Sequence, residues 1–365
     1  MKKIGILTYH RAINYGALLQ GYALQEKIKE CGADAGMIDY RSDFIENAYR
    51  TMWGLNKKKL SSWKYTIKGI HDVKTKKKKF RAFGEKYLNL TKKYDRSNVS
   101  ATENEFDKIV TGSDQVWNMD VCGNDRAYML DYVKDDRKKA SYAVSLGSYK
   151  FKDDEVGLIK KFNNISIREK GSCEYVSDIT GKEGHVDVDP TLLLTGDKWE
   201  KVVLKENPVK KPYIFIYSVH PQNNMVEYAK KLAKEKNLEI YHLHNRVKKE
   251  MKEPGVNLLF DCSPEEFLTL IHDAEYVITN SFHGTVFSIV YHRQFLSELE
   301  TRGGFNNRVW ELLNALGINR RILEQKIYFD RNFNIDEAID WDDVEQKLAG
   351  LREGSVEYIR KLISE

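Results

Sequence analysis

The sequence predicts an α/β protein built on two parallel, doubly wound sheets with helices on both faces. Short apolar runs typical of buried strands alternate with segments of helical periodicity. This alternation occurs twice, before and after a polar, lysine-rich stretch that ends at Pro208 and Pro212. The length of 365 residues also suits two domains. We therefore expect an N-terminal domain over residues 1–208 and a C-terminal domain over residues 209–365.

In the first half, the apolar run at residues 4–9 predicts a strand. Leu, Ile and Tyr residues spaced for one buried face predict a helix that follows residue 15 and ends at Gly32. The run at residues 35–40 completes a strand–helix–strand unit. A basic helical insertion follows at about residues 50–96. Further strands of this half are expected at residues 108–111, 140–145 and 165–167.

The second half repeats the alternation and ends in a long helix. Its strands are expected at residues 213–217, 238–243 and 276–279. Its helices are expected at residues 223–236, 264–272, 284–291 and 341–363. In such sheets ligands bind beyond the carboxyl ends of the strands, so the residues that follow strands are the first candidates for function.

The composition describes a packed globular protein. The apolar fraction is 41%, the charged fraction 31% and the mean hydropathy −0.57. No run approaches the roughly 20 apolar residues of a membrane span, and the apolar stretch after Lys2 and Lys3 is too short for a secretory signal. The four cysteines are dispersed, which predicts reduced, buried thiols and gives no sign of a metal site. We expect a cytoplasmic location.

The charge is concentrated in one segment. The whole chain carries +5, but residues 50–96 carry +13 and the remainder −8. Such a segment attracts an anionic membrane, a nucleic acid or an anionic acceptor, and it also fits a solvated helix face. Its scattered aromatic residues give no base-stacking platform, so we expect no nucleic-acid partner. The residues that stand out are Lys57–Lys59, Lys76–Lys79, Trp53 and Trp63.

Polar residues follow four of the predicted strands. They are Asn14-Tyr15-Gly16, Gly112-Ser113-Asp114-Gln115, Ile167-Arg168-Glu169 and Asn280-Ser281-Phe282-His283-Gly284. In the last group, Asn280 and Ser281 are suited to cap a helix whose free N–H groups favour an anion, with His283 in its first turn. This combination suits a phosphate.

Each of these residues also has an ordinary structural interpretation. His283 fits a satisfied core or surface position, Asp114 fits a helix cap instead of a general base, and Arg168 fits an ion-pair partner instead of a fork for a ligand carboxylate or phosphate. Arg302 and Arg308 lie in a basic loop that enters a helix. The chain has no three-glycine dinucleotide fingerprint, no Gly-Lys-Ser/Thr loop and no spaced metal-ligand cluster.

The order and spacing of several motifs resemble the polysaccharide pyruvyl transferase family over about residues 3–316. The carrying motifs are Tyr9–Leu24, Thr111–Asn118, Ser166–Glu169, Val188–Thr191 and Thr279–Ile289. The resemblance implies two Rossmann-like domains that face each other across a cleft, in a glycosyltransferase-B-like arrangement. It also implies transfer of pyruvate from phosphoenolpyruvate to a sugar as a ketal, with an acceptor often held on a lipid carrier at the inner membrane face.

Under this resemblance the two halves have different roles, and no cofactor is required. The donor side is expected to comprise Arg168, Asn280, Ser281, His283, Gly284, Thr285, Arg302 and Arg308. The acceptor side is expected to comprise Asn14, Tyr15, Gly16, Asp114 and Gln115. His283 would hold the donor phosphate and act as general acid, and Asp114 would act as base or orient the acceptor. The basic segment would hold the enzyme at the anionic membrane.

One position departs from the family pattern. Better-characterised members carry an Arg two residues before the motif His, and this chain has Ser281 there. Arg168, Arg302 or Arg308 could supply the cation, or the chain uses another donor. Two other functions therefore stay open: a nucleotide-sugar-dependent glycosyltransferase of the same two-domain plan, and a degenerate, non-catalytic glycan-binding member.

Overall fold

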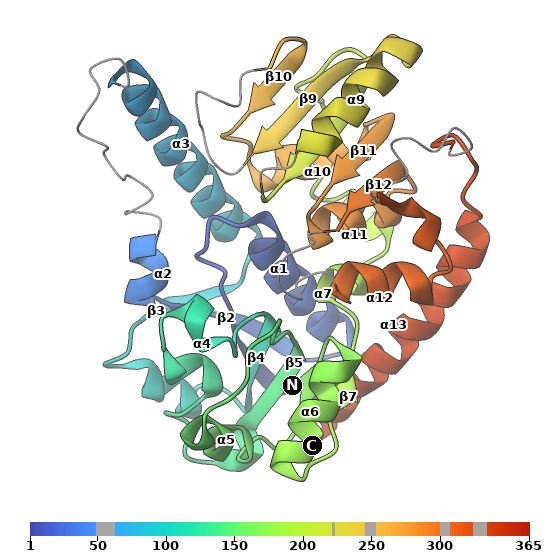
Figure 1. Cartoon of the computed structure of the whole chain (residues 1–365). Coiled ribbons are helices and arrows are strands. Elements are labelled where there is room, and N and C mark those ends of the chain that lie inside the picture. The colour runs from blue at the N-terminus through green and yellow to red at the C-terminus, as the bar shows by residue number, and fades with distance from the viewer. Residues whose placement is uncertain (49–62, 221–222, 245–252, 300–306, 324–333) are drawn as a thin grey trace. The chain divides into compact units, whose positions relative to one another are not determined.

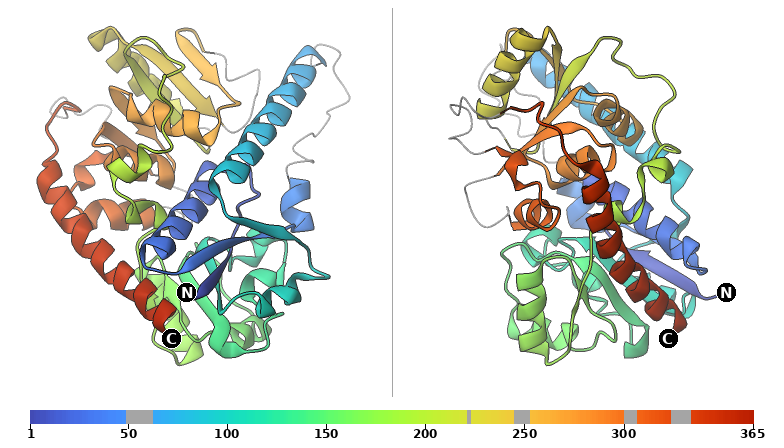
Figure 2. Two further views of the ribbon diagram at one scale, coloured as in Figure 1. Left: turned by 180° about the vertical axis from the view of Figure 1, so that it is seen from behind. Right: turned by 90° about the vertical axis from the view of Figure 1, so that its right-hand side faces the viewer.

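The computed structural model describes the chain except for residues 49–62, 221–222, 245–252, 300–306 and 324–333. The chain forms two compact units. Unit 1 comprises Met1–Met52, Gly84–Leu194 and Leu348–Glu365, and unit 2 comprises Trp53–Phe83 and Thr195–Lys347. Both chain termini therefore belong to unit 1 (Figures 1 and 2).

Unit 1 is built on a seven-stranded parallel sheet with the order β3-β2-β1-β4-β5-β6-β7. Because the order reverses between β1 and β4, right-handed crossovers place helices on both faces. The strands are β1 (Lys3–Leu7), β2 (Asp34–Tyr40), β3 (Leu90–Tyr94), β4 (Lys108–Asp114), β5 (Lys139–Val144), β6 (Ser166–Ile167) and β7 (His185–Val186). The helices are α1 (Tyr15–Glu30), α2 (Asp43–Ala48), α4 (Met119–Cys122), α5 (Asp153–Ile159), α6 (Lys170–Thr180) and α7 (Pro190–Leu193).

Unit 2 repeats this plan with six parallel strands in the order β10-β9-β8-β11-β12-β13. The strands are β8 (Tyr213–Ser218), β9 (Glu239–His244), β10 (Val256–Leu259), β11 (Tyr276–Thr279), β12 (Gln294–Glu298) and β13 (Ile322–Leu323). The helices are α8 (Gly196–Trp199), α9 (Asn223–Lys236), α10 (Pro264–His272), α11 (Phe282–Val290) and α12 (Asn307–Ala315). β8 is buried along its whole length, as expected for a strand covered on both faces.

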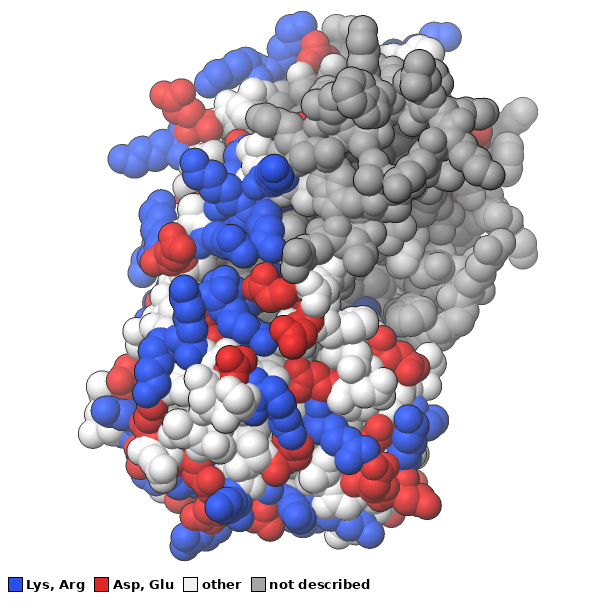
Figure 3. All heavy atoms as spheres, turned by 90° about the vertical axis from the view of Figure 1, so that its left-hand side faces the viewer, with Lys and Arg blue, Asp and Glu red and all other residues white. Residues whose placement is uncertain are grey.

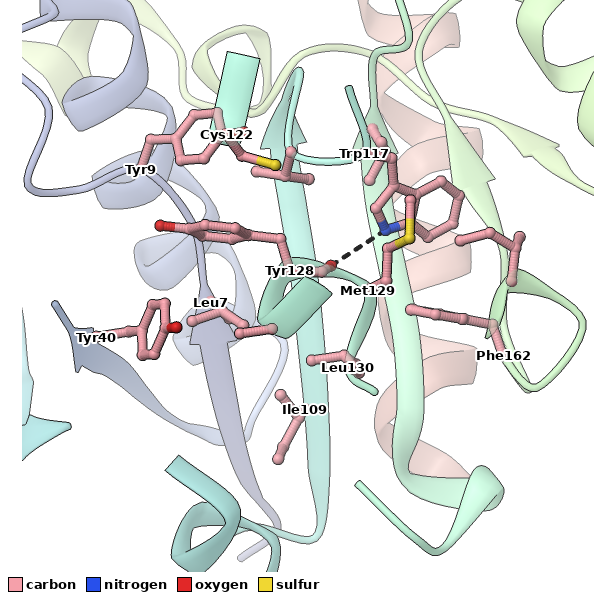
Figure 4. Packing of buried hydrophobic residues seen from close by; sticks show 14 of the residues in the cluster. Leu7, Tyr9, Tyr40, Ile109, Trp117, Cys122, Tyr128, Met129, Leu130 and Phe162 are labelled. Atoms are coloured by element: carbon pink, nitrogen blue, oxygen red, sulfur yellow. Dashed lines mark hydrogen bonds between the residues drawn. The ribbon is translucent and has the colours of Figure 1, made fainter. Parts of the chain in front are cut away.

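A hydrophobic core of unit 1 packs along β1 and β4 (Figure 4). Trp117, from the Gly-Ser-Asp-Gln-x-Trp run, is completely buried there. Its indole Nε1 donates a hydrogen bond to the Tyr128 carbonyl oxygen at 3.2 Å, and its ring meets Phe162 edge-on with centroids 5.0 Å apart. Trp117 therefore holds the segment after β4 against the core.

The predicted fold class, with two parallel doubly wound sheets, is confirmed. The units divide the chain differently from the predicted boundary after residue 208. The polar stretch before Pro208 belongs to unit 2, because Trp199 is buried there against Phe287, with ring centroids 5.0 Å apart. Five strands were not predicted: β3, β7, β10, β12 and β13. Of these, β7 and β13 have only two residues each, too few for a period to be visible.

Two long helices are divided between the units. α3 (Trp63–Tyr87) begins in unit 2 and ends in unit 1, so the basic segment is not an insertion within the N-terminal domain alone. α13 (Trp341–Ser364) also begins in unit 2, and its later turns pack on the sheet of unit 1, where the Tyr358 hydroxyl donates to the Ser141 carbonyl oxygen at 2.9 Å. Among the described residues, no helix has the length and apolar character needed to cross a membrane.

Two leucines one turn apart on α13 test its packing on unit 1. Leu348 is completely buried, whereas Leu351 leaves 39% of its surface exposed. We expect Leu348→Ala to lower the free energy of unfolding by about 2–5 kcal/mol, because it leaves a cavity. Leu351→Ala should change it by less than about 0.5 kcal/mol. Urea unfolding of both variants checks this, and equal losses would show that α13 is not packed in this way.

Candidate functional site

The order of the strands points to one edge in each unit. Each sheet reverses its strand order at one place, between β1 and β4 in unit 1 and between β8 and β11 in unit 2. Ligands of doubly wound sheets bind at the carboxyl edge beside such a reversal. Asn14 and Asp114 follow β1 and end β4, and Ser281 follows β11. Most of the predicted site residues therefore lie at these two edges.

The exit of β4 has an irregular backbone that the sequence did not reveal. Gly112 has φ +129°, and a Cβ on it would lie 2.2 Å from the Tyr142 carbonyl oxygen, so only glycine fits. The peptide bond between Gly112 and Ser113 is cis, and Asp114 has φ +70°. The Ser113 N–H donates to Gln20 Oε1 at 2.8 Å, and its hydroxyl donates to the Ala143 carbonyl oxygen at 2.5 Å. Neighbouring elements thus fix the direction in which Asp114 leaves the sheet.

The predicted acceptor residues divide into surface and core. Asn14 is exposed, and its side chain caps α1 by accepting from the Ala17 N–H at 3.3 Å. Asp114 and Gln115 are partly exposed at the same edge. Tyr15 is completely buried and presents no surface to an acceptor, and Gly16 is buried in the first turn of α1.

Arg168 lies in unit 1 and is almost completely buried. Its guanidinium forms an ion pair with Asp189, with Nη2 and Oδ2 2.8 Å apart, and donates a hydrogen bond to the Ser113 hydroxyl. Asp189 also accepts from the Thr191 N–H at 2.9 Å and so caps α7. This geometry favours the structural interpretation of Arg168 over a donor-binding fork.

A second charged cluster in unit 1 was missed by the sequence analysis. His10 Nε2 lies 3.2 Å from Asp39 Oδ1, and the Arg41 side chain donates two hydrogen bonds to the same carboxylate. Burial raises the pKa of Asp39, but the hydrogen bonds from His10 and Arg41 and the charge of Arg11 outweigh it, so the pKa lies below its ordinary value. Asp39 therefore stays ionised. It is suited to hold the side chains of His10 and Arg41 in place, and not to act as a general base. Its position near the carboxyl end of β2, the strand next to β1, is the signal that could have marked it.

The edge of unit 2 is formed by the start of α11. Ser281 caps this helix by accepting from the Gly284 N–H at 3.4 Å, and His283 lies almost buried in the first turn. The guanidinium carbon of Arg308, on α12, lies 5.5 Å from the centre of the Phe282 ring. A helix N-terminus, an imidazole and a guanidinium are therefore close to one another in the chain's fold, and all three attract anions. Arg302 lies outside the described residues.

The other predicted residues at this edge have structural contacts. The Asn280 side chain accepts from the Val219 N–H at 2.8 Å and donates to the His220 carbonyl oxygen at 2.9 Å. The Thr285 hydroxyl is buried and lies 2.6 Å from Ser297 Oγ. The packing of α11 on β11 requires a glycine at position 284, because a Cβ there would lie 2.4 Å from Thr279 Oγ1. The expected approach of a ligand to Gly284 is therefore not needed to explain the glycine.

Three further polar residues lie at the carboxyl ends of β8 and β9. Ser218 Oγ and His242 Nε2 form a hydrogen bond of 2.7 Å, and the rings of His242 and His244 lie 5.7 Å apart. Burial, with a smaller effect of His244, lowers the pKa of His242 to about 4. The sequence signal is the Tyr-His-Leu-His alternation at the end of a strand, which places both imidazoles on one face. Among the residues that the structure describes, no three His, Cys, Asp or Glu side chains come together as a metal site.

A glycine substitution tests the packing at the start of α11. The Thr279 hydroxyl donates to the Tyr217 carbonyl oxygen at 2.7 Å and accepts from the Ser281 N–H at 3.0 Å, so it has little room to move. We expect Gly284→Ala to lower the free energy of unfolding by about 1–3 kcal/mol through overpacking. Gly350→Ala, in an open position of α13, is the control and should be neutral or stabilising by up to about 1 kcal/mol. Equal thermal unfolding of the two variants would contradict the close contact.

Comparison with solved structures shows a shared fold. The S. aureus MnaA–UDP co-structure is 11% identical, with a TM-score of 0.50, and the match covers 95% of this chain and 87% of that one. A Listeria monocytogenes protein described as a candidate UDP-N-acetylglucosamine 2-epimerase is also 11% identical, with a TM-score of 0.50 and coverage of 99% and 90%. These likenesses confirm the glycosyltransferase-B-like fold class and carry no further argument.

Comparison at the level of sequence identifies the family. No curated protein matches the chain significantly. The family model described as polysaccharide pyruvyl transferase matches residues 14–297, a range that includes the edges at Asn14, Asp114 and His283. The chain therefore belongs to the polysaccharide pyruvyl transferase family, which is a family of transferases.

Proposed function

We propose that the protein transfers pyruvate from phosphoenolpyruvate to a sugar of a surface-polysaccharide precursor, forming a ketal and releasing phosphate. The observation that carries this proposal is the family match, which spans both strand-order reversals and the residues placed there. The reaction requires no cofactor, because phosphoenolpyruvate already holds its pyruvyl group in an activated form.

The start of α11 suits the donor. Phosphoenolpyruvate carries a carboxylate and a phosphate, and both need donors of positive or partly positive charge. The first turn of α11 offers backbone N–H groups and the His283 imidazole, and Arg308 lies beside Phe282 at the same edge of unit 2. Other members carry an arginine at the position of Ser281. In this chain the guanidinium of Arg308, which lies next to Phe282, can supply that positive charge.

The chemistry assigns one proton transfer to each edge. Protonation of the donor's methylene carbon by His283 produces a cationic carbon, which the first sugar hydroxyl attacks. The phosphate then leaves, and a second hydroxyl of the same sugar attacks the same carbon to close the ketal. One hydroxyl proton replaces the proton that His283 gave, and the other leaves with the phosphate. Asp114 accepts the first of these two protons and releases it to solvent, from which His283 is protonated again, while Asn14 and Gln115 orient the acceptor.

Calorimetric titration of the wild type and His283→Ala with phosphoenolpyruvate tests the donor. We expect the wild type to bind, and His283→Ala to bind at least about tenfold more weakly, since it loses a hydrogen bond to a charged group. UDP, GDP and CMP serve as nucleotide controls and should not bind. Circular dichroism of the variant confirms that it is folded.

Each other result favours a different function. Binding of a nucleotide in place of phosphoenolpyruvate would favour a nucleotide-sugar-dependent glycosyltransferase. Binding of an acceptor glycan without turnover would favour a degenerate glycan-binding member. Equal binding of phosphoenolpyruvate by the wild type and His283→Ala would remove His283 from the donor site.

The basic segment presents only part of its charge to solvent. Lys57–Lys59 and Trp53 lie outside the described residues. Lys76 is only 5% exposed, and burial lowers its pKa to about 8. Lys79 Nζ forms an ion pair with Glu266 at 2.9 Å. Lys76 and Lys79 thus face the rest of unit 2, which corrects the expectation that all of Lys76–Lys79 is available to a membrane.

The other two lysines of that run and two further cations form the outward face of α3. Figure 3 shows Lys and Arg side chains gathered along this helix. They recur at the spacing of one helix face and are at least partly exposed: Lys74, Lys77, Lys78 and Arg81. We propose that this stripe holds the enzyme at an anionic membrane surface, where a lipid-carried acceptor would be found.

A charge-matched pair of variants tests the stripe. Replacing Lys74, Lys77, Lys78 and Arg81 with Gln should abolish most binding to vesicles that contain anionic lipid, since each cation near the surface is worth about 1 kcal/mol. The control replaces four exposed lysines of unit 1 with Gln and removes the same charge: Lys134, Lys160, Lys161 and Lys170. Wild-type binding should fall as salt is added. Equal pelleting of the two variants with vesicles would dismiss the stripe.

A further inference from the structure

The turn that follows β8 is held in place from both neighbouring strands. On one side, Ser218 ends β8 and its hydroxyl is hydrogen-bonded to His242 of β9 at 2.7 Å. The strand register pairs Ser218 with His244 and Ile216 with His242, so these side chains share one face of the sheet. On this face α9 covers the apolar residues that precede them.

From the other side, Asn280 holds the same turn. Its side-chain oxygen accepts from the Val219 N–H at 2.8 Å, and its amide nitrogen donates to the His220 carbonyl oxygen at 2.9 Å. The backbone N–H of Asn280 also donates to the Tyr217 carbonyl oxygen at 3.4 Å. Three contiguous residues, the last of β8 and the first two of the turn, are therefore hydrogen-bonded to β9 or to the residue that follows β11.

This turn occupies the place where doubly wound sheets bind ligands. It is the strand-to-helix connection of β8, which borders the reversal of strand order with β11. Asn280, which holds the turn, directly precedes Ser281, the cap of α11. Of residues 218–220, His220 is the exposed one, and His242 and His244 of the neighbouring strand are buried.

We propose that His220 is a further ligand-binding residue of the donor site, and that His242 is a positioning residue that acts through Ser218 on the turn that presents His220. The imidazole of His220 donates a hydrogen bond to a phosphate or carboxylate oxygen of the bound anion. The identity of that anion as phosphoenolpyruvate rests on the proposed function, but the role of His220 requires only that an anion binds at this edge.

The chemistry of His242 agrees with a positioning role. Its pKa of about 4 keeps the imidazole of His242 neutral at ordinary pH. His242 can therefore hold Ser218 without placing a second positive charge that would attract the anion away from His220. The ring of His244 lies 5.7 Å from that of His242, and His244 lowers the pKa of His242 further. A neutral amide of similar reach can replace such a group, whereas an apolar side chain cannot.

Calorimetric titration with phosphoenolpyruvate, and separately with inorganic phosphate, tests the proposal. His220→Gln should weaken binding of the anion about tenfold or more, because a hydrogen bond to a charged group is lost. His242→Leu should weaken it severalfold, and His242→Gln, which can still reach Ser218, should restore it. His272→Gln is the matched control, because His272 ends α10 ahead of β11 and so lies away from the carboxyl edge of the same sheet. Thermal unfolding confirms that each variant is folded.

The two ligands separate this proposal from the proposed function. If only inorganic phosphate binds and His220→Gln weakens it, the donor assignment fails and the role of His220 stands. If phosphoenolpyruvate binds equally to the wild type, His220→Gln and His272→Gln, the donor assignment stands and the role of His220 is overturned. Failure of both ligands to bind the wild type overturns both. If His242→Leu and His242→Gln bind alike, the positioning role of His242 is overturned.

Discussion

The buried ion pair between Arg168 and Asp189 organises the carboxyl edge of unit 1. Arg168 follows β6, Asp189 caps α7, and the same guanidinium reaches the Ser113 hydroxyl at the exit of β4. α7 in turn packs against α1, whose cap is Asn14. Removing one partner of a buried pair leaves an uncompensated charge and typically costs about 3–5 kcal/mol. The direction in which Asp114 leaves the sheet therefore depends on residues far from it in the sequence.

In unit 2, neutral groups and not an ion pair hold the backbone at the carboxyl edge of the sheet. Its edge is held by the Ser281 cap, the Thr279 hydroxyl and the side chain of Asn280, with a close contact between Gly284 and Thr279. Hydrogen bonds of this kind fix the backbone without placing a fixed charge beside the helix N-terminus. An anion at this edge then meets the partial positive charge of α11 without competition from a carboxylate among these groups.

The sequence was sufficient for the architecture because the strands are buried on both faces. Continuous apolar runs such as residues 213–217 mark such strands, and the polar residues that follow them mark the carboxyl edges. The sequence could not show which polar residues turn inward. Arg168 and Tyr15 follow strands just as Asp114 does, but the fold buries them. Lys76 and Lys78 stand in one lysine run, and only the rotation of α3 separates the buried residue from the exposed one. The contact of His10 with Asp39 joins the turn after β1 to β2, two segments far apart in the sequence, and leaves no local pattern.

The cap at Ser281 gives a physical reason for a serine at the position where the family resemblance implies an arginine. A serine hydroxyl is short enough to accept from the Gly284 N–H, and an arginine side chain has no acceptor with which to do so. The exchange of arginine for serine thus gains helix stability and loses a cation. If this edge binds the donor, as we propose, the cation must come from another element, and Arg308 beside Phe282 has the planar donor geometry to provide it. A guanidinium on α12 approaches the anion from a different direction than one at the helix start would. Under the proposed function, we therefore expect this chain to differ from other members of its family in the shape of the donor that it accepts, and not in whether it binds an anion at this edge.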